Sequence, residues 1–234
     1  MKKRLLGIML TNRCNANCAM CGLSCSPKLN GVIDETLMIE AINQAKEAEM
    51  FKQISFTGGE AFLYPELLIK GSNYAKKLGF KTSVASNGFW GSWSNGKIDA
   101  ILSKAALDVI FFSFDAFHNE YVSQEAFEGA LKACKRNKIK CEVSIGEARG
   151  KYSVNNFLKS LGKFKYFMEY SIYPFYRVGR AENLPKEVFY PLRNMKKRCY
   201  DGGVIAIRYD GELFPCCSPA IVEGERKRLQ HQHC

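Results

Sequence analysis

The chain has 234 residues with 47% apolar, 12% aromatic and 24% charged side chains, which favours one globular domain, or one with a small appendage, and excludes disordered, collagen-like and coiled-coil proteins. The net charge is +11, but the basic residues are scattered in pairs and triplets and no nucleic-acid-binding module is recognisable. A nucleic acid is therefore not an expected partner. The excess positive charge could instead compensate cysteine thiolates or attract an acidic peptide.

The first ten residues imitate a secretory signal peptide, because three basic residues precede an apolar run, residues 5–10. The run is short, Asn12 and Arg13 follow it, and no small-residue cleavage site precedes Cys14. No apolar run approaches the roughly 20 residues of a membrane span, so we expect a cytoplasmic protein with no membrane partner. In a reducing compartment, clustered cysteines indicate metal ligands or catalytic groups before disulfides.

Short apolar runs alternate with helical patterns along most of the chain. Strands are expected at residues 5–10, 53–56, 81–85, 108–114, 139–145 and 167–173. Helices are expected after an N-cap at Asp34, from Pro65 to Gly79, and at residues 98–106, 120–137 and 154–161. Six such units predict an α/β fold with a parallel sheet, because each right-handed crossover returns the chain beside the preceding strand.

Four unusual segments follow the first four strands. They contain Cys14, Cys18 and Cys21; Gly58, Gly59 and Glu60; Ser86, Asn87 and Gly88; and Ser113 and Asp115. In parallel sheets, the loops that leave the carboxyl ends of the strands share one face, where the chemistry of such folds collects. We therefore expect all four segments on one rim of the sheet.

The pattern changes from about Arg177 onward. A β-hairpin is predicted from residues 204–207, the turn Asp210-Gly211 and residues 213–214. Three cysteines flank this hairpin: Cys199, Cys216 and Cys217.

Cys14, Cys18 and Cys21 are spaced so that one loop can aim three thiolates at a single metal centre. A cubane iron-sulfur cluster normally takes four cysteines, so three would leave one iron open to a substrate or cofactor. Cys25 follows at a spacing that could instead close the site, as an electron-transfer cluster or a structural zinc site. The cysteine spacing alone does not decide between the open and the closed site.

The neighbouring loops add a more specific signal. The pattern C-x3-C-x2-C after the first strand, with Gly-Gly-Glu after the second, resembles the radical S-adenosylmethionine (radical SAM) enzymes over roughly residues 5–180. The resemblance implies a partial (β/α)6 barrel of the TIM type and a [4Fe-4S] cluster on Cys14, Cys18 and Cys21, with SAM chelated by the remaining iron. It also implies reductive cleavage of SAM to a 5′-deoxyadenosyl radical, which takes a hydrogen atom from the substrate.

The second loop suits a close approach to a ligand. Gly58 and Gly59 lack side chains, and Glu60 can accept a hydrogen bond from the ammonium group of SAM. An ordinary glycine turn before the next helix is the alternative interpretation.

The remaining SAM contacts that the resemblance implies come from other loops. Ser86, Ser113 and Asp115 loosely match the ribose-side positions of the family, although a serine or aspartate at a strand end is as often a helix cap. Met20 stands where the family usually has an aromatic residue near the adenine, and its apolar, polarizable side chain can substitute.

The C-terminal cysteines resemble the opening of a SPASM or Twitch domain, which holds auxiliary iron-sulfur clusters. We expect a radical SAM core over residues 1–182 and a partial auxiliary region over residues 183–234. At most one auxiliary cluster is expected, with Cys199 and Cys216 as its firmest ligands, unless the chain is truncated and cannot assemble it. Cys217 is a hypothetical hydrogen-atom donor to a substrate radical, with a fourth cluster ligand or a buried thiol as the alternatives.

The expected enzyme abstracts hydrogen from a ribosomally made peptide, which then undergoes epimerisation or cross-linking. Its expected partners are a peptide with an acidic leader and a reductant such as flavodoxin or ferredoxin. One alternative is an activase that installs a glycyl radical on another enzyme. Another is a closed four-cysteine electron-transfer or binding protein without SAM chemistry. We also expect Cys134 and Cys141 in the core and His118 at the surface or in a cap.

Overall fold

The computed structural model describes residues 4–174, 176–190 and 204–214 of the chain. Their strands are β1 (Arg4–Thr11), β2 (Phe51–Gly58), β3 (Lys81–Ser86), β4 (Val109–Ser113), β5 (Lys140–Glu147), β6 (Tyr170–Pro174), β7 (Val204–Ile207) and β8 (Leu213–Phe214). Their α-helices are α1 (Glu35–Glu47), α2 (Pro65–Lys77), α3 (Asn95–Leu102), α4 (Gln124–Arg136) and α5 (Val154–Ser160). Short 3-10 helices are η1 (Ala61–Leu63), η2 (Phe89–Ser92), η3 (Gly150–Tyr152), η4 (Gly162–Phe167), η5 (Gly179–Asn183) and η6 (Lys186–Val188).

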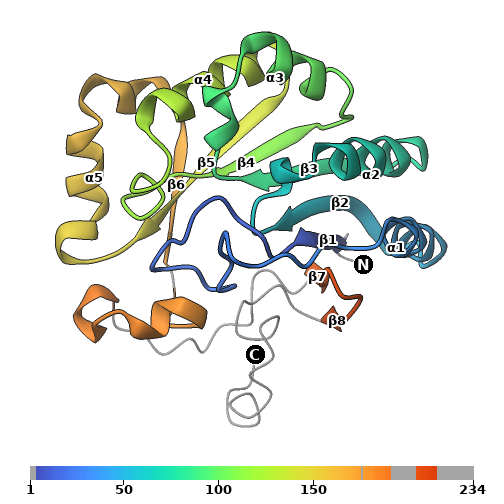
Figure 1. The fold of residues 1–234 in the computed structure, drawn as a ribbon, viewed down its shortest axis with the longest axis horizontal. Coiled ribbons are helices and arrows are strands. Elements are labelled where there is room, and N and C mark those ends of the chain that lie inside the picture. The colour runs from blue at the N-terminus through green and yellow to red at the C-terminus, as the bar shows by residue number, and fades with distance from the viewer. Residues whose placement is uncertain (1–3, 175, 191–203, 215–234) are drawn as a thin grey trace.

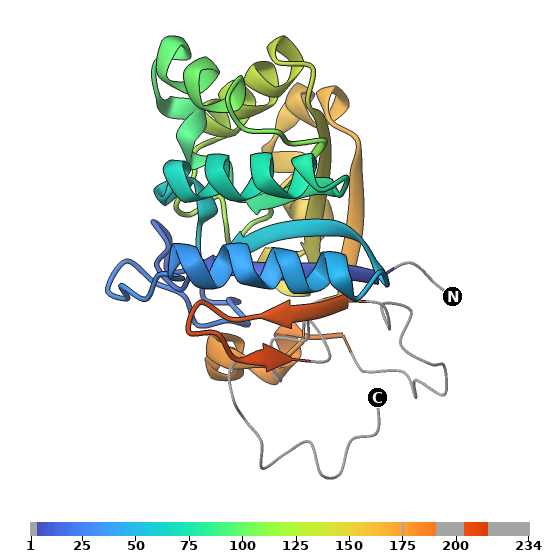
Figure 2. The same ribbon diagram turned by 90° about the vertical axis from the view of Figure 1, so that its right-hand side faces the viewer.

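These strands form one sheet in the order β6-β5-β4-β3-β2-β1-β7-β8. From β1 to β6 each strand pairs in parallel with the next. The helices α1 to α5 lie along the outer side of the curved sheet (Figures 1 and 2). The predicted α/β fold with a partial, TIM-like barrel of six parallel strands is confirmed.

The C-terminal hairpin joins this sheet. β7 runs parallel to β1, with Leu5 opposite Val204 and Ile8 opposite Ile207, and β8 returns antiparallel to β7. Gly211 in the turn has a φ of 91°, a conformation that favours glycine. The turn residues predicted the hairpin itself, but a parallel pairing between opposite ends of the chain leaves no local pattern from which to predict it.

Three of the element starts that differ from the prediction are decided by local capping and turn chemistry. The side chains of Ser94 and Ser123 cap α3 and α4, so α3 starts earlier and α4 later than expected. The segment before β6 winds into the 3-10 helix η4, so β6 begins at Tyr170 and not at residue 167.

The main core lies between the sheet and the helices and is rich in aromatic rings. Phe114, directly after β4, stacks on Phe127 of α4 with 3.9 Å between ring centroids, and Phe112 meets the same ring edge-on. Cys134 is fully buried in this core and Cys141 packs against it, which confirms both as core thiols. This rigid layer holds the carboxyl ends of the strands in place.

Candidate functional site

The loop after β1 gathers four cysteines at the rim of the sheet. Cys14, Cys18 and Cys25 are buried and Cys21 is partly exposed. Their shared surroundings are a small apolar cluster, distinct from the main core. The charges of Cys14 and Cys21 both act on Cys18, and Cys25 is hydrogen-bonded to Cys21. The structure therefore brings the three predicted ligands together, and it brings Cys25 with them.

Burial makes two of these thiolates costly in the absence of a cation. Desolvation raises the pKa of Cys14 to about 12, and it raises the pKa of Cys18 further still. By contrast, a hydrogen bond with Cys25 lowers the pKa of Cys21 to about 6. Because the thiolate is the metal ligand, bound iron would supply the positive charge that the buried sulfurs of Cys14 and Cys18 require.

The donor set fits an iron-sulfur cluster. A [4Fe-4S] cluster is held by cysteine thiolates on different irons, so its ligands need not converge on one point. Among the residues that the structure describes, no three His, Cys, Asp or Glu side chains are placed to hold one metal ion. Three cysteine sulfurs from a single loop match the ligand chemistry that a cluster needs.

Arg180, in η5 after β6, fixes the shape of the cysteine loop. Its guanidinium donates to the carbonyl oxygens of Cys18 at 2.8 Å, Ser24 at 2.8 Å and Cys25 at 2.6 Å. Its backbone N–H donates to the carbonyl of Cys21 at 3.0 Å. The charge of Arg180 also lowers the pKa of Cys14 and of Cys21. Sequence analysis assigned no role to Arg180, because its contacts lie more than 150 residues away in the chain.

Gly58 and Gly59 bring the second loop against the first. A Cβ on Gly58 would collide with the carbonyl oxygen of Thr11, and one on Gly59 with that of Arg13. The N–H of Gly59 donates to Thr11 at 2.7 Å, and that of Glu60 to Arg13 at 2.9 Å. In this structure the missing side chains of the two glycines allow two backbone segments to pack closely. The sequence analysis expected the same lack of side chains to allow the close approach of a ligand.

Glu60 is almost fully buried and connects the second loop to the third. Its carboxylate accepts hydrogen bonds from the Ser86 hydroxyl at 2.9 Å and from the backbone N–H groups of Phe62 at 3.1 Å and Asn87 at 2.8 Å. Burial nevertheless raises its pKa from 4.5 to about 7. Glu60 therefore acts as a structural acceptor between loops as well as a candidate ligand-binding group.

The pKa of Glu60 predicts a specific pH dependence of stability. Between about pH 4.5 and 7 the folded chain keeps a proton that the unfolded chain releases, so this contribution to stability is lost as the pH rises through that window. We expect the free energy of unfolding of the wild type, relative to Glu60→Gln, to fall by on the order of 2 kcal/mol between pH 4.5 and pH 8. Urea unfolding of metal-free protein measures this difference, with the exposed Glu66→Gln as control. An equal difference at both pH values would contradict the assignment.

Asn87 is a site residue that sequence analysis placed on the rim without assigning it a role. Its side chain is buried, and its amide donates to Asn15 at 2.9 Å, beside the Cys14 sulfur at 3.9 Å. Ser86 also turns inward, where its hydroxyl accepts from the indole N–H of Trp90 at 3.0 Å. The third loop thus supports the first. The position of Asn87 directly after a strand was the feature of the sequence that could have indicated its role.

A cavity of about 230 Å³ lies at the carboxyl ends of β4, β5 and β6. Its lining includes three residues expected there, Met20, Ser113 and Asp115, and four others: His118, Ser144, Gly146 and Tyr173. The first loop and three strand ends therefore contribute to one hollow on the predicted rim.

Asp115 and His118 form a hydrogen-bonded pair that lines this cavity. The Asp115 carboxylate accepts from the backbone N–H groups of Phe117, His118 and Gly146, and it lies 2.9 Å from His118 Nδ1. Although burial opposes both charges, the pair lowers the pKa of Asp115 and raises that of His118. His118 is thus part of the site rather than a surface residue, and Asp115 both caps its own turn and faces the cavity.

Several predicted residues cannot be placed. Cys199, Cys216 and Cys217 lie outside the described residues.

Among the helices that are described, none has the length and apolar character to cross a membrane.

Comparisons with known proteins agree with this geometry. The family description "Radical SAM superfamily" matches residues 8–146. A curated protein of Bacillus subtilis (strain 168), named "Putative peptide biosynthesis protein YydG", is 29% identical over 232 residues, covering 95% of this chain and 72% of its own. The resemblance thus extends beyond the segment that the family description matches.

Two solved structures share the fold. One is anSMEcpe with bound AdoMet and a Cp18Cys peptide, with a TM-score of 0.53, 20% identity and coverage of 73% of this chain and 50% of that one. The other is methylornithine synthase (PylB), with a TM-score of 0.56, 15% identity and coverage of 80% and 58%. The chain therefore spans about half the length of the anSMEcpe structure that it matches.

Proposed function

Because the chain belongs to the radical SAM superfamily, we propose that it holds a [4Fe-4S] cluster on Cys14, Cys18 and Cys21, binds SAM beside it, and modifies a peptide. When bound, these groups supply a 5′-deoxyadenosyl radical by reductive cleavage of SAM. The observation that carries the proposal is that the loop with the three thiols also contributes Met20 to a cavity that Asp115 lines on the same rim.

Residues around the cavity would orient SAM. We assign Ser113 and Asp115 to the ribose and Met20 to the adenine, because these side chains line the cavity together. Glu60 accepts three hydrogen bonds within the protein, which leaves about one of its acceptor positions for the ammonium group of SAM. His118 holds the Asp115 carboxylate in its charged form, so that carboxylate stays an acceptor for a ribose hydroxyl.

A peptide is the proposed substrate. The protein YydG is named for peptide biosynthesis, and the anSMEcpe structure holds a peptide. The net charge of +11 favours a substrate with an acidic leader. The proposed reaction is hydrogen abstraction from a carbon of the peptide, followed by epimerisation or cross-linking, with a flavodoxin or ferredoxin as electron donor.

In an epimerisation, the proposed role of Cys217 is to donate a hydrogen atom to the substrate radical. Abstraction from a Cα produces 5′-deoxyadenosine and a carbon radical, and the Cys217 thiol returns a hydrogen atom to the opposite face. The resulting thiyl radical then takes one electron and one proton, the electron from the external reductant. Cys199 and Cys216 are proposed as ligands of one auxiliary cluster in the region 183–234, whose hairpin β7–β8 extends the sheet of the core 1–182.

The test uses full-length protein reconstituted anaerobically with iron and sulfide and reduced with dithionite. It is incubated in D₂O with SAM and a candidate substrate peptide that carries an acidic leader. We expect 5′-deoxyadenosine and, for epimerisation, a peptide that gains one deuterium at a carbon atom. The absence of 5′-deoxyadenosine would overturn the proposal. Cys217→Ala should retain iron and SAM cleavage but release no deuterated epimer, whereas loss of iron would make Cys217 a ligand instead.

A further inference from the structure

Strand β6 forms one edge of the sheet and exposes large side chains. Within the described part of the chain it pairs only with β5. Ile172 is 47% exposed and Tyr173 55%, which is unusual for apolar residues of a strand. An exposed apolar edge strand offers backbone hydrogen-bonding groups and side-chain contacts to a further strand.

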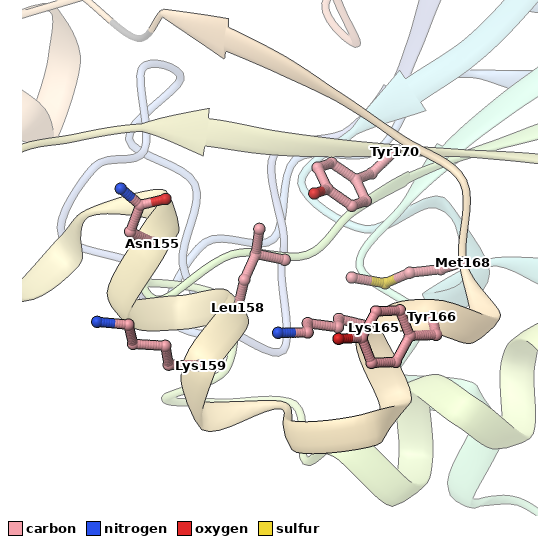
Figure 3. A pocket seen from close by; sticks show the side chains of 7 residues that line it. All are labelled: Asn155, Leu158, Lys159, Lys165, Tyr166, Met168 and Tyr170. Atoms are coloured by element: carbon pink, nitrogen blue, oxygen red, sulfur yellow. The ribbon is translucent and has the colours of Figure 1, made fainter.

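A second cavity, of about 590 Å³, lies at the start of β6 between α5, η4 and the strand (Figure 3). Lys159 and Lys165 are among the residues that line it, and its lining contains no carboxylate. Lys165 lies 5.1 Å from the Tyr166 ring, and among the described residues neither lysine forms an ion pair. Glu169, the nearest acid in the sequence, does not line the cavity. This cavity therefore combines uncompensated positive charge with an apolar floor.

The short strand β6 connects this basic cavity with the cavity on the rim. Tyr170, its first residue, lines the basic cavity, whereas Tyr173 lines the rim cavity together with Met20. A strand of this length spans about 16 Å at 3.3 Å per residue. A chain lying along the edge could contact the lysines with one part while another part reaches the rim.

We propose that the edge of β6 docks the peptide substrate in an extended form, with acidic side chains of its leader at Lys159 and Lys165. The inference rests on the proposed function for the identity of the peptide. Charge complementarity favours an acidic segment, and a strand edge that no other described strand covers favours an extended backbone. Segments of the peptide beyond Tyr173 would then enter the rim cavity, where the chemistry is proposed to occur.

The test measures binding of a fluorescein-labelled peptide, acetyl-(Glu-Val)5-amide, to the full-length reconstituted protein by fluorescence anisotropy. Charge reversal in Lys159→Glu/Lys165→Glu should weaken binding by about tenfold or more. The matched control, Lys163→Glu/Lys186→Glu, changes the net charge equally at exposed residues that do not line the cavity, and it should change the affinity by less than about twofold. Similar losses in both double variants would overturn the proposal, because the attraction would then depend only on overall charge.

Hydrogen exchange measured by mass spectrometry tests strand addition independently. The peptide should slow amide exchange at residues 170–173 of the wild type beyond the protection that pairing with β5 already gives. Protection of all these amides without peptide would show that the chain itself covers the edge, and added protection that appears only with rising protein concentration would show a second copy; either outcome overturns the proposal. SAM cleavage by the wild type without peptide is measured separately, so that failure of the radical SAM chemistry and failure of docking remain distinguishable.

Discussion

Replacement of any one of Cys14, Cys18 and Cys21 with alanine should remove the cluster and lower SAM cleavage by more than about 100-fold. Cys25→Ala should retain both the cluster and SAM cleavage. Even residues that only orient metal ligands commonly cost 10–100-fold in metal affinity or activity, so loss of a ligand is expected to cost more. Iron and sulfide content, visible absorption and 5′-deoxyadenosine yield measure the effect.

Cys25 decides between the open and the closed site. It is 2% exposed, lies in the same apolar cluster as the other three cysteines, and lowers the pKa of Cys21 through a hydrogen bond. We interpret it as a support for the Cys21 thiolate, so its removal should raise the pKa of Cys21 without removing the cluster. Cys141→Ala, which changes a thiol of the main core, is the control for general effects of cysteine loss. If Cys25→Ala lost iron as completely as Cys21→Ala, four thiolates would close the site.

The gathering of the site on one rim was predictable because it depends only on strand and helix alternation. Any parallel sheet with crossover helices places the loops after successive strands together, whatever the exact strand boundaries. Cys14, Gly59 and Asp115 could therefore be placed on one face from their positions alone. The sequence could not indicate that the Gly59 backbone packs against Arg13, since that contact depends on the path of two loops.

The residues that were missed act across the fold. Asn87 reaches Asn15, and Arg180 reaches Cys18, through contacts between segments far apart in the chain. His118 is separated from Asp115 by only three residues, but a histidine in a turn gives no sign of its burial. Long-range polar contacts follow from tertiary packing and have no periodic signature in the sequence.

Arg180→Met should loosen the cysteine loop and reduce cluster content and SAM cleavage by about 10–100-fold. The guanidinium fork holds three carbonyl groups between Cys18 and Cys25, and methionine removes every one of these donors. Removal of its positive charge should also lower the reduction potential of any cluster that still assembles, because the reduced cluster carries more negative charge. Arg180→Lys keeps the positive charge but loses the planar fork of donors. Compared with Arg180→Met, it should therefore bring the reduction potential closer to the wild-type value than it brings the iron content.

Arg177 provides a matched control three residues away. It is exposed, and its guanidinium donates to the Glu182 carbonyl at 2.8 Å. Arg177→Met should leave iron content and reduction potential close to the wild type, as measured by iron analysis and by redox titration followed by electron paramagnetic resonance. Equal behaviour of Arg177→Met and Arg180→Met would show that Arg180 does not position the loop. A selective loss in Arg180→Met, with the potential recovered in Arg180→Lys, would separate the electrostatic effect of Arg180 from its hydrogen-bonding effect.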